Sequence, residues 1–144
     1  GFRGAIRRAT HRCMERLSAR YASRPASLRT LRAELRPWLA RQQLGDTLAW
    51  EILVSAHEAA ANAVDHGRVP TFDLEVSSDP TGVEVTVRDA GGWRPPLAGD
   101  PERGRGLEIM RRLADRFETA GSPDGTTIRL RFDVRRAEVD ARAA

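Results

Sequence analysis

Apolar residues recur in steps of three and four along four segments of the chain. This spacing predicts amphipathic helices over residues 2–17, 27–42, 48–66 and 107–117. Ser27 is suited to be the N-cap of the second of these helices, and Pro37 inside it is expected to kink or loosen it. The third helix is expected to end at Gly67.

Other segments alternate apolar and polar residues, which is the period of a half-buried strand. Residues 71–78 and 82–89 flank the turn sequence Asp-Pro-Thr-Gly and predict one β-hairpin. Residues 117–121 and 126–134 flank Ser-Pro-Asp-Gly and predict a second. The middle of residues 18–25 has the composition of a short edge strand before Pro25.

Hairpins interleaved with helices predict an α+β fold. The expected architecture is a two-layer sandwich with helices on one face of a mixed, mostly antiparallel sheet. The chain has 144 residues, enough for one domain with a core. We expect an N-terminal amphipathic linker helix over residues 1–18, a folded domain over 19–134, and a tail or linker over 135–144. Because the sequence does not begin with Met, we expect it to be part of a longer protein.

Arginine supplies all 24 basic side chains, and there is no lysine. This excludes a Walker-type P-loop and a eukaryotic-style protein kinase, since each needs a lysine at the phosphates. Residues 1–42 hold 11 Arg against two Glu, a net charge of +9, and the remainder has 13 Arg against 18 acids, a net of −5. The basic half suits an acidic partner or a nucleic acid, or is simply a solvated surface.

Two further features of the composition indicate the cellular compartment in which the protein is expected. Cys13 is the single cysteine, so no internal disulfide is possible, which fits a reducing cytoplasm. No apolar run approaches the ~18 residues of a membrane span. We therefore expect a cytoplasmic protein without a membrane partner.

The predicted helix over residues 48–66 has a polar stripe. Its members follow steps of four and three and share one side: Glu51, Ser55, Glu58, Asn62 and Asp65. On its own this stripe is the solvated edge of an amphipathic helix. His57-Glu58 resembles the start of a zinc-protease motif, but Ala61 stands where the second histidine is required, so zinc is excluded.

Three glycine-containing motifs follow the polar stripe. Asp89 ends a strand directly before Gly91 and Gly92, an arrangement that can hold the amine edge of a heterocycle. Gly104 and Gly106 are expected to open a helix, whose free N–H groups can hold phosphate without a lysine. The fourth feature, Gly-Thr-Thr at residues 125–127, is by itself an ordinary hairpin turn.

The order of the four features resembles the GHKL ATPases. Glu-x-x-x-Asn on a helix, strand-Asp-x-Gly, Gly-x-Gly-Leu opening a helix and Gly-Thr-Thr entering a strand are that superfamily's ordered motifs, and the likeness extends over about residues 20–134. Within it the chain is most similar to the anti-sigma-factor serine/threonine kinases of bacteria. It is closest to the form fused behind a PP2C-type phosphatase domain in actinobacterial regulators.

This resemblance implies roles for individual residues. It implies that Asn62 ligates Mg²⁺, that Glu58 is the general base, and that Asp89 accepts the adenine amino group with Gly91 close to the base. It also implies that Thr127 supports Asp89 through water. The loop that closes over the phosphates is implied to comprise four residues, with Arg103 adding positive charge near the γ-phosphate: Gly104, Arg105, Gly106 and Leu107.

The resemblance also implies a function, with ATP and Mg²⁺ as cofactors. The expected activity is phosphorylation of a STAS-type anti-sigma-factor antagonist by a kinase that alternatively holds a sigma factor inactive. An attached PP2C-type phosphatase domain and a second copy of the chain are further expected partners. The alternative is a non-catalytic ATP-sensing module that binds sigma factor or regulates the attached phosphatase. A nucleic-acid-binding arm is the least favoured interpretation, because the first predicted helix has no interleaved aromatic residue beyond Phe2.

Overall fold

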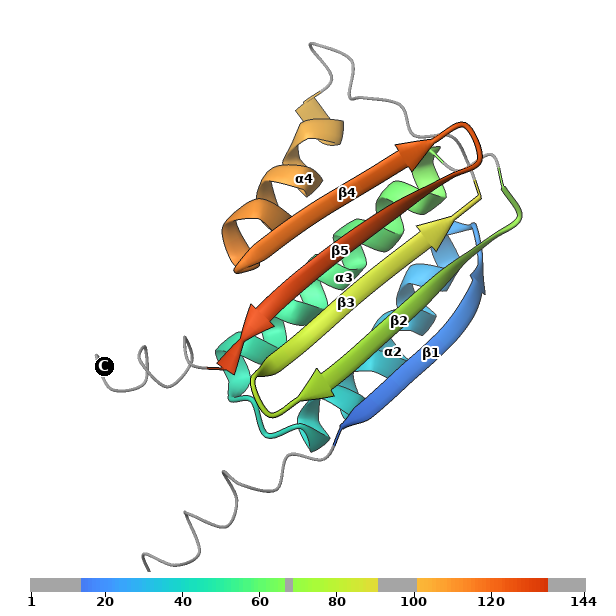
Figure 1. Ribbon diagram of the computed structural model, residues 1–144. Helices are drawn as coiled ribbons and strands as arrows, with labels where there is room; N and C mark the ends of the chain where they lie inside the picture. Colours follow the sequence, from blue (N-terminus) through green and yellow to red (C-terminus); the bar gives the residue numbers. More distant parts are fainter. Residues whose placement is uncertain (1–13, 67–68, 91–100, 135–144) are drawn as a thin grey trace, which may run out of the picture.

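The computed structural model describes residues 14–66, 69–90 and 101–134, which form two layers (Figure 1). The elements in chain order are β1 Glu15–Ala22, α2 Pro25–Arg41, α3 Asp46–His66, β2 Thr71–Asp79, β3 Gly82–Asp89, α4 Pro101–Leu113, β4 Arg116–Ser122 and β5 Gly125–Asp133. The strands form one sheet in the order β1-β2-β3-β5-β4, and the helices cover one of its faces. This confirms the predicted α+β sandwich. All four strand pairings are antiparallel, so the sheet is not mixed.

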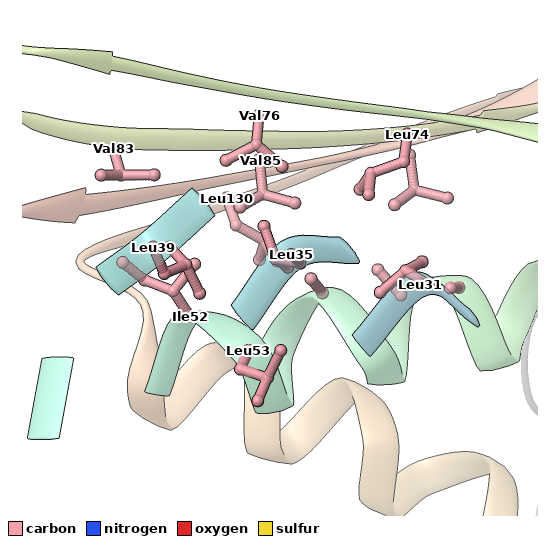
Figure 2. Close-up of a cluster of buried hydrophobic side chains, with 14 of the residues drawn as sticks. Leu31, Leu35, Leu39, Ile52, Leu53, Leu74, Val76, Val83, Val85 and Leu130 are labelled. Carbon is pink, nitrogen blue, oxygen red and sulfur yellow. The ribbon is translucent and has the colours of Figure 1, made fainter. Parts of the chain in front are cut away.

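The core lies between the sheet and the helices, where the two hydrophobic periods meet. Alternate residues of the central strands point to the helical side, among them Leu74, Val76, Val83, Val85 and Leu130. Leucines of α2, at steps of four, and Ile52 of α3 pack against them (Figure 2). All of these side chains are fully buried or nearly so. The predicted hairpins are therefore confirmed with their apolar sides inward.

The predicted helix over residues 2–17 is wrong at its C-terminal end. Residues 1–13 lie outside the described part of the chain, but Glu15–Leu17 belong to β1, a strand at the edge of the sheet. The reason is visible in the register, which places Leu17 opposite Val76 and Tyr21 opposite Phe72, so that alternate residues reach the core. The expected short edge strand before Pro25 is confirmed, and it is longer than predicted.

The boundaries of two helices also differ from prediction. α2 begins at Pro25 with Arg24 as its N-cap, and Ser27 lies inside the first turn with its side chain buried. Proline is favoured at the first helical position because its fixed φ suits the helix. The helix continues past Pro37, which lies on its exposed side. α4 ends at Leu113, and Phe117 belongs to β4.

No helix in the described part of the chain combines the length and apolar character that crossing a membrane requires.

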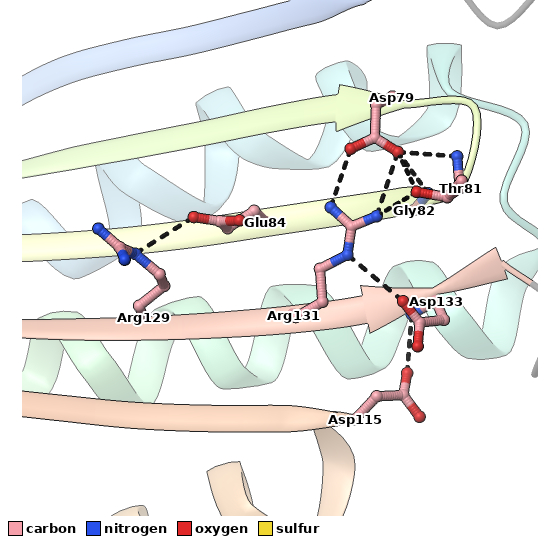
Figure 3. A network of polar contacts seen from close by, with 8 residues as sticks. All are labelled: Asp79, Thr81, Gly82, Glu84, Asp115, Arg129, Arg131 and Asp133. Carbon is pink, nitrogen blue, oxygen red and sulfur yellow. Dashed lines mark hydrogen bonds and ion pairs between the residues drawn. The ribbon is translucent and has the colours of Figure 1, made fainter.

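A network of charged groups holds the β2–β3 turn to the end of β5 (Figure 3). Asp79 Oδ1 accepts hydrogen bonds from the backbone N–H groups of Thr81, at 2.7 Å, and Gly82, at 3.0 Å. Arg131 donates to both carboxylate oxygens of Asp79, at 2.9 and 3.1 Å, and to Asp133 at 3.3 Å. The hydrogen bonds from Arg131 hold the pKa of Asp79 well below its usual range.

We expect Arg131→Met to lower the free energy of unfolding at pH 7 by roughly 1–2 kcal/mol, because the Asp79 carboxylate loses its charged hydrogen-bond donor. Since the pKa of Asp79 is depressed in the folded state, its stabilisation is present above the unfolded pKa and disappears as the pH falls below about 4. The difference between the wild type and this variant should therefore shrink in acid. Urea denaturation at several pH values measures it.

Arg129→Met is the matched control, since Arg129 is the next outward-facing arginine on β5 and pairs with Glu84 at 3.2 Å on a more exposed surface. A change of under about 0.5 kcal/mol is expected for it. Equal losses for the two variants would contradict the assigned role of Arg131.

Candidate functional site

The orientation of α3 determines which of its side chains are available for chemistry. Ile52, Ala56, Ala59 and Ala63 are buried against the sheet. Glu58 and Asn62, one turn apart, lie to the side of this buried face and are partly exposed. A carboxylate and an amide oxygen are thus held at the edge of the core, within reach of solvent.

α4 approaches this pair closely at Gly106. A Cβ atom placed on Gly106 would lie 2.9 Å from Glu58 Oε2 and 3.7 Å from Asn62 Oδ1. The absence of a side chain therefore lets the backbone of α4 lie directly beside both groups. The structure brings Glu58, Asn62 and Gly106 together.

The predicted start of α4 is wrong. Gly104 and Gly106 were expected to open the helix, but it begins at Pro101, and both glycines lie within its first two turns. Proline is again favourable at the first helical position. The first four residues of a helix have no intrahelical acceptor for their N–H groups, so free amides here belong to residues 102–104 and not to Gly106.

The polar stripe predicted on α3 is also not uniformly solvated. The Ser55 side chain is fully buried, and its Oγ has no hydrogen-bond partner among the described residues. It lies one turn before Glu58, on the side of α3 along which α4 packs. Asp65, at the end of the helix, is exposed. The sequence pattern could not anticipate this burial because it does not show which helix covers the stripe.

A second carboxylate lies at the end of β3. Asp89 of β3 lies directly opposite the buried Phe72 of β2 in the sheet. Its side chain therefore points to the helical side of the sheet. Gly125 at the start of β5 comes close to it, because a Cβ atom there would lie 2.7 Å from the Asp89 carbonyl oxygen. Glycine at this turn permits the close contact between the two strands.

The register of β5 corrects one predicted residue. Thr126, and not Thr127, lies opposite Asp89, so Thr126 shares its face of the sheet. Thr127 lies opposite Arg88 and points to the other face. The strand's own alternation contained this signal, because Ile128, an inward-facing residue, has the same parity as Thr126.

These groups lie at one end of the molecule (Figure 1). The end of β3, the start of β5 and the C-terminal half of α3 lie at the upper right of this view, and α4 packs along α3, with Gly106 beside Glu58 and Asn62. Gly91 and its neighbours in residues 91–100 lie outside the described residues, as does the side chain of Arg103. Arg105 is exposed, and Leu107 is partly buried against the core. Within the described residues, the candidate site therefore comprises five residues: Glu58, Asn62, Asp89, Gly106 and Thr126.

His57 belongs to a different contact. Arg32 of α2 donates to His57 Nδ1 at 2.9 Å, which ties α2 to α3. Burial and the neighbouring Arg32 charge lower the pKa of His57, and the nearby Glu58 partly opposes this. A neutral imidazole with Nδ1 as acceptor fits the geometry. Within the described residues no group of three His, Cys, Asp or Glu side chains could hold a metal ion.

Comparisons with known proteins agree with the fold described above. Residues 21–132 match the family described as the histidine kinase-like ATPase domain, which is more than half of the chain. Among solved structures, the chain is similar to the RsbU and RsbW domains of Rv1364c from Mycobacterium tuberculosis, with a TM-score of 0.69 and 24% identity. The match covers 82% of this chain and 31% of that one, so the chain spans under a third of that protein's solved length. At this identity the likeness shows the shared fold.

The two close-approach glycines are expected to respond differently to alanine. Gly125→Ala should destabilise the protein by roughly 1–3 kcal/mol, because its methyl group meets a backbone oxygen that cannot turn away. Gly106→Ala should leave stability unchanged or raise it by up to about 1 kcal/mol, because the flexible end of Glu58 can move and alanine favours the helix. Thermal and urea denaturation of both variants test this. A large loss for Gly106→Ala would show that the Glu58 carboxylate is held in place and cannot move away from the added methyl group.

Proposed function

The chain belongs to the histidine kinase-like ATPase domain family, and from that premise we propose that it is an ATP- and Mg²⁺-dependent serine/threonine protein kinase of the anti-sigma-factor type. The family implies ATP binding. The observation that most strongly supports the finer proposal is the position of Gly106 against both Glu58 and Asn62. A carboxylate and an amide oxygen beside one helix terminus suit a transferring phosphoryl group and its metal.

Asp89 is proposed to hold the nucleotide base. Its side chain points to the helical side of the sheet at the end of β3, where a carboxylate can accept a hydrogen bond from an exocyclic amine. Thr126 shares that face directly opposite and replaces Thr127 as the proposed supporting residue. Gly91, two residues after Asp89, is retained from the sequence motif as a neighbour of the base.

The residues that are proposed to lie near the ATP phosphates fit a magnesium ion. Asn62 offers the oxygen ligand that Mg²⁺ prefers, and the described residues provide no cluster that would bind a metal by itself. Such an ion would be held by Asn62 together with phosphate and water oxygens. When bound, it would neutralise charge on the phosphates. Free amides in the first turn of α4, over residues 102–104, are proposed to approach the same phosphates, with Arg103, Gly104 and Arg105 in the closing segment.

Glu58 is proposed as the general base. Its carboxylate is partly exposed and lies one turn before Asn62, so the two groups can meet the same γ-phosphate from one helix. It would take the proton from the attacking serine or threonine hydroxyl as the phosphoryl group moves from ATP to that oxygen and ADP leaves. Phosphoryl transfer requires mainly positioning and charge neutralisation, which these few groups can supply without lysine.

The partners are proposed from family likeness. The substrate would be a STAS-type anti-sigma-factor antagonist, and the alternative binding partner a sigma factor, in the cytoplasm. The solved relative has RsbU and RsbW domains in one chain. This supports the proposal that a PP2C-type phosphatase domain is joined to the present domain in its parent protein.

One observation favours a second candidate function, a non-catalytic nucleotide-sensing module. The Cβ position of Gly106 lies 2.9 Å from Glu58 Oε2, so α4 covers this carboxylate oxygen on one side and leaves less room there for a hydroxyl substrate than for a nucleotide alone. Such a module would bind ATP and regulate a sigma factor or an attached phosphatase without transferring phosphate.

Glu58→Gln separates the two functions. We expect it to reduce phosphoryl transfer to a purified antagonist by at least about 10²-fold, because the base is lost, while ATP affinity stays within about twofold. Transfer from [γ-³²P]ATP and binding of a fluorescent ATP analogue provide the two measurements. Glu51→Gln, on the same side of α3 but two turns earlier, is the matched control and should retain transfer. Transfer that survives Glu58→Gln would remove the assigned base, and a wild type that binds ATP without any transfer would favour the sensing module.

The two threonines of β5 provide a test of the base-binding end. Thr126→Val should weaken ATP binding by about tenfold, because it removes a hydroxyl on the Asp89 face. Thr127→Val should change affinity by under about twofold, because that side chain points to the opposite face. Titration with the fluorescent analogue measures both. The reverse ranking would contradict the register as the basis of the assignment.

A further inference from the structure

The outward side of α3, away from the sheet, has an unusual composition. Four residues in steps of four, three and four follow this side and are called the outer stripe: Trp50, Val54, His57 and Ala61. It contains no acidic side chain and no arginine. α2 lies to one side of it, since Arg32 of α2 reaches His57 at 2.9 Å. α4 lies to the other side, beside Glu58.

The apolar members of the outer stripe lie outside the hydrophobic core of the described residues. Trp50 is 58% exposed and is one of two large hydrophobic side chains that are exposed in the described part of the chain. Val54 and Ala61 are partly exposed and do not pack against the core, whereas Val64 further along the helix does. A tryptophan that a fold leaves in water is typical of binding hot spots, where its large apolar area is covered by a partner.

The neighbouring surface of α2 is basic. The contact between Arg32 and His57 shows which side of α2 faces α3. The same side bears Arg29 and Arg36, because they are three residues before and four residues after Arg32. Among the salt bridges of the described residues none involves Arg29 or Arg36, and both are exposed. The one acidic residue of α2, Glu34, accepts a hydrogen bond from Tyr21 on another side.

Several arginines on the open face of the sheet are paired with acids. On the open face of the sheet Arg16 pairs with Glu75 and Arg20 with Asp73, at 3.7 and 2.7 Å. The arginine border of the outer stripe differs from that face, because no salt bridge within the described residues involves Arg29, Arg32 or Arg36. Uncompensated positive charge beside an exposed apolar stripe is complementary to an acidic, amphipathic partner.

We propose that the outer stripe, together with its arginine border on α2, binds an acidic amphipathic helix of a partner protein. A helix fits because the stripe runs along α3 beside a neighbouring helix, and no strand edge lies in this layer. Apolar residues of the partner at i, i+3 and i+7 would cover Trp50 and Val54. Its acidic residues would face Arg32 and Arg36. This surface uses none of the residues proposed to bind nucleotide or transfer phosphate.

Two synthetic 18-residue helical peptides provide the probe for the complete 144-residue chain. Both peptides have leucine at i, i+3 and i+7 along one side of the helix. The positions on either side of these leucines are glutamate in the first peptide and lysine in the second. We expect the glutamate peptide to bind in fluorescence anisotropy, more weakly as salt increases, and the lysine peptide not to bind. Trp50→Ala and Arg36→Glu should each weaken binding by at least about tenfold.

Matched controls lie away from the outer stripe. Met14→Ala removes the other exposed large hydrophobic side chain, and Arg16→Glu reverses an arginine on the open sheet face; both should leave the affinity within about twofold. ATP binding should be unchanged in all four variants, so failure here is distinguishable from failure of the proposed kinase. Equal binding of both peptides, binding that survives Trp50→Ala, or no binding of either peptide would overturn the proposal. Sedimentation that shows self-association lost on Trp50→Ala would assign the surface to a second copy instead.

Discussion

Small side chains along one side of α3 are the constraint on which the rest of the structure depends. Ala56, Ala59, Ala60 and Ala63 are all at most 3% exposed, and with Ile52 they let α3 lie directly on the sheet. This fixes the rotation of the helix about its axis. Glu58 and Asn62 then necessarily point sideways to α4, and Trp50 points outward. One helix thereby has a core face, a polar face and an unused apolar face.

Gly106 completes this arrangement, because the backbone of α4 lies directly beside the Glu58 carboxylate at this position. The charged residues are distributed differently over the two layers. On the open face of the sheet, arginines alternate with acids across the strands and are largely paired, as in Arg129 with Glu84. That pairing weakens the case for a nucleic-acid surface there, since arginines committed to acids are less available to phosphates. The groups of the candidate site, in contrast, lie on the helical side of the sheet.

Much of the fold could be predicted from the sequence because the two hydrophobic periods are clear. The hairpin over β2 and β3 followed from alternation around a good turn sequence, and α3 followed from its long apolar stripe. β1 was missed at its start because residues 15–17 satisfy a helical step and an alternating step at once, and pairing with β2 decides between them. Helix starts were misplaced at α2 and α4 for one reason, the preference of proline for the first helical position.

The candidate site was predictable to a similar degree. Glu58, Asn62 and Asp89 came from motif order, and the structure brings the first two together with Gly106. Thr126 was confused with Thr127 because the pairing of β3 with β5 joins strands that are distant in sequence. The burial of Ser55 depends on α4, and no pattern within α3 could reveal it. Tertiary pairing, and not local propensity, accounts for both differences.

The central claim is that α3, the end of β3 and the start of α4 form one nucleotide site. The most direct measurement is a crystal structure with a non-hydrolysable ATP analogue and Mn²⁺ in place of Mg²⁺, in which anomalous scattering locates the metal. The account predicts a metal peak beside Asn62 Oδ1, phosphates between Glu58 and the first turn of α4, and the adenine amine against Asp89. A nucleotide bound away from Asp89, or a metal without Asn62 among its ligands, would contradict it.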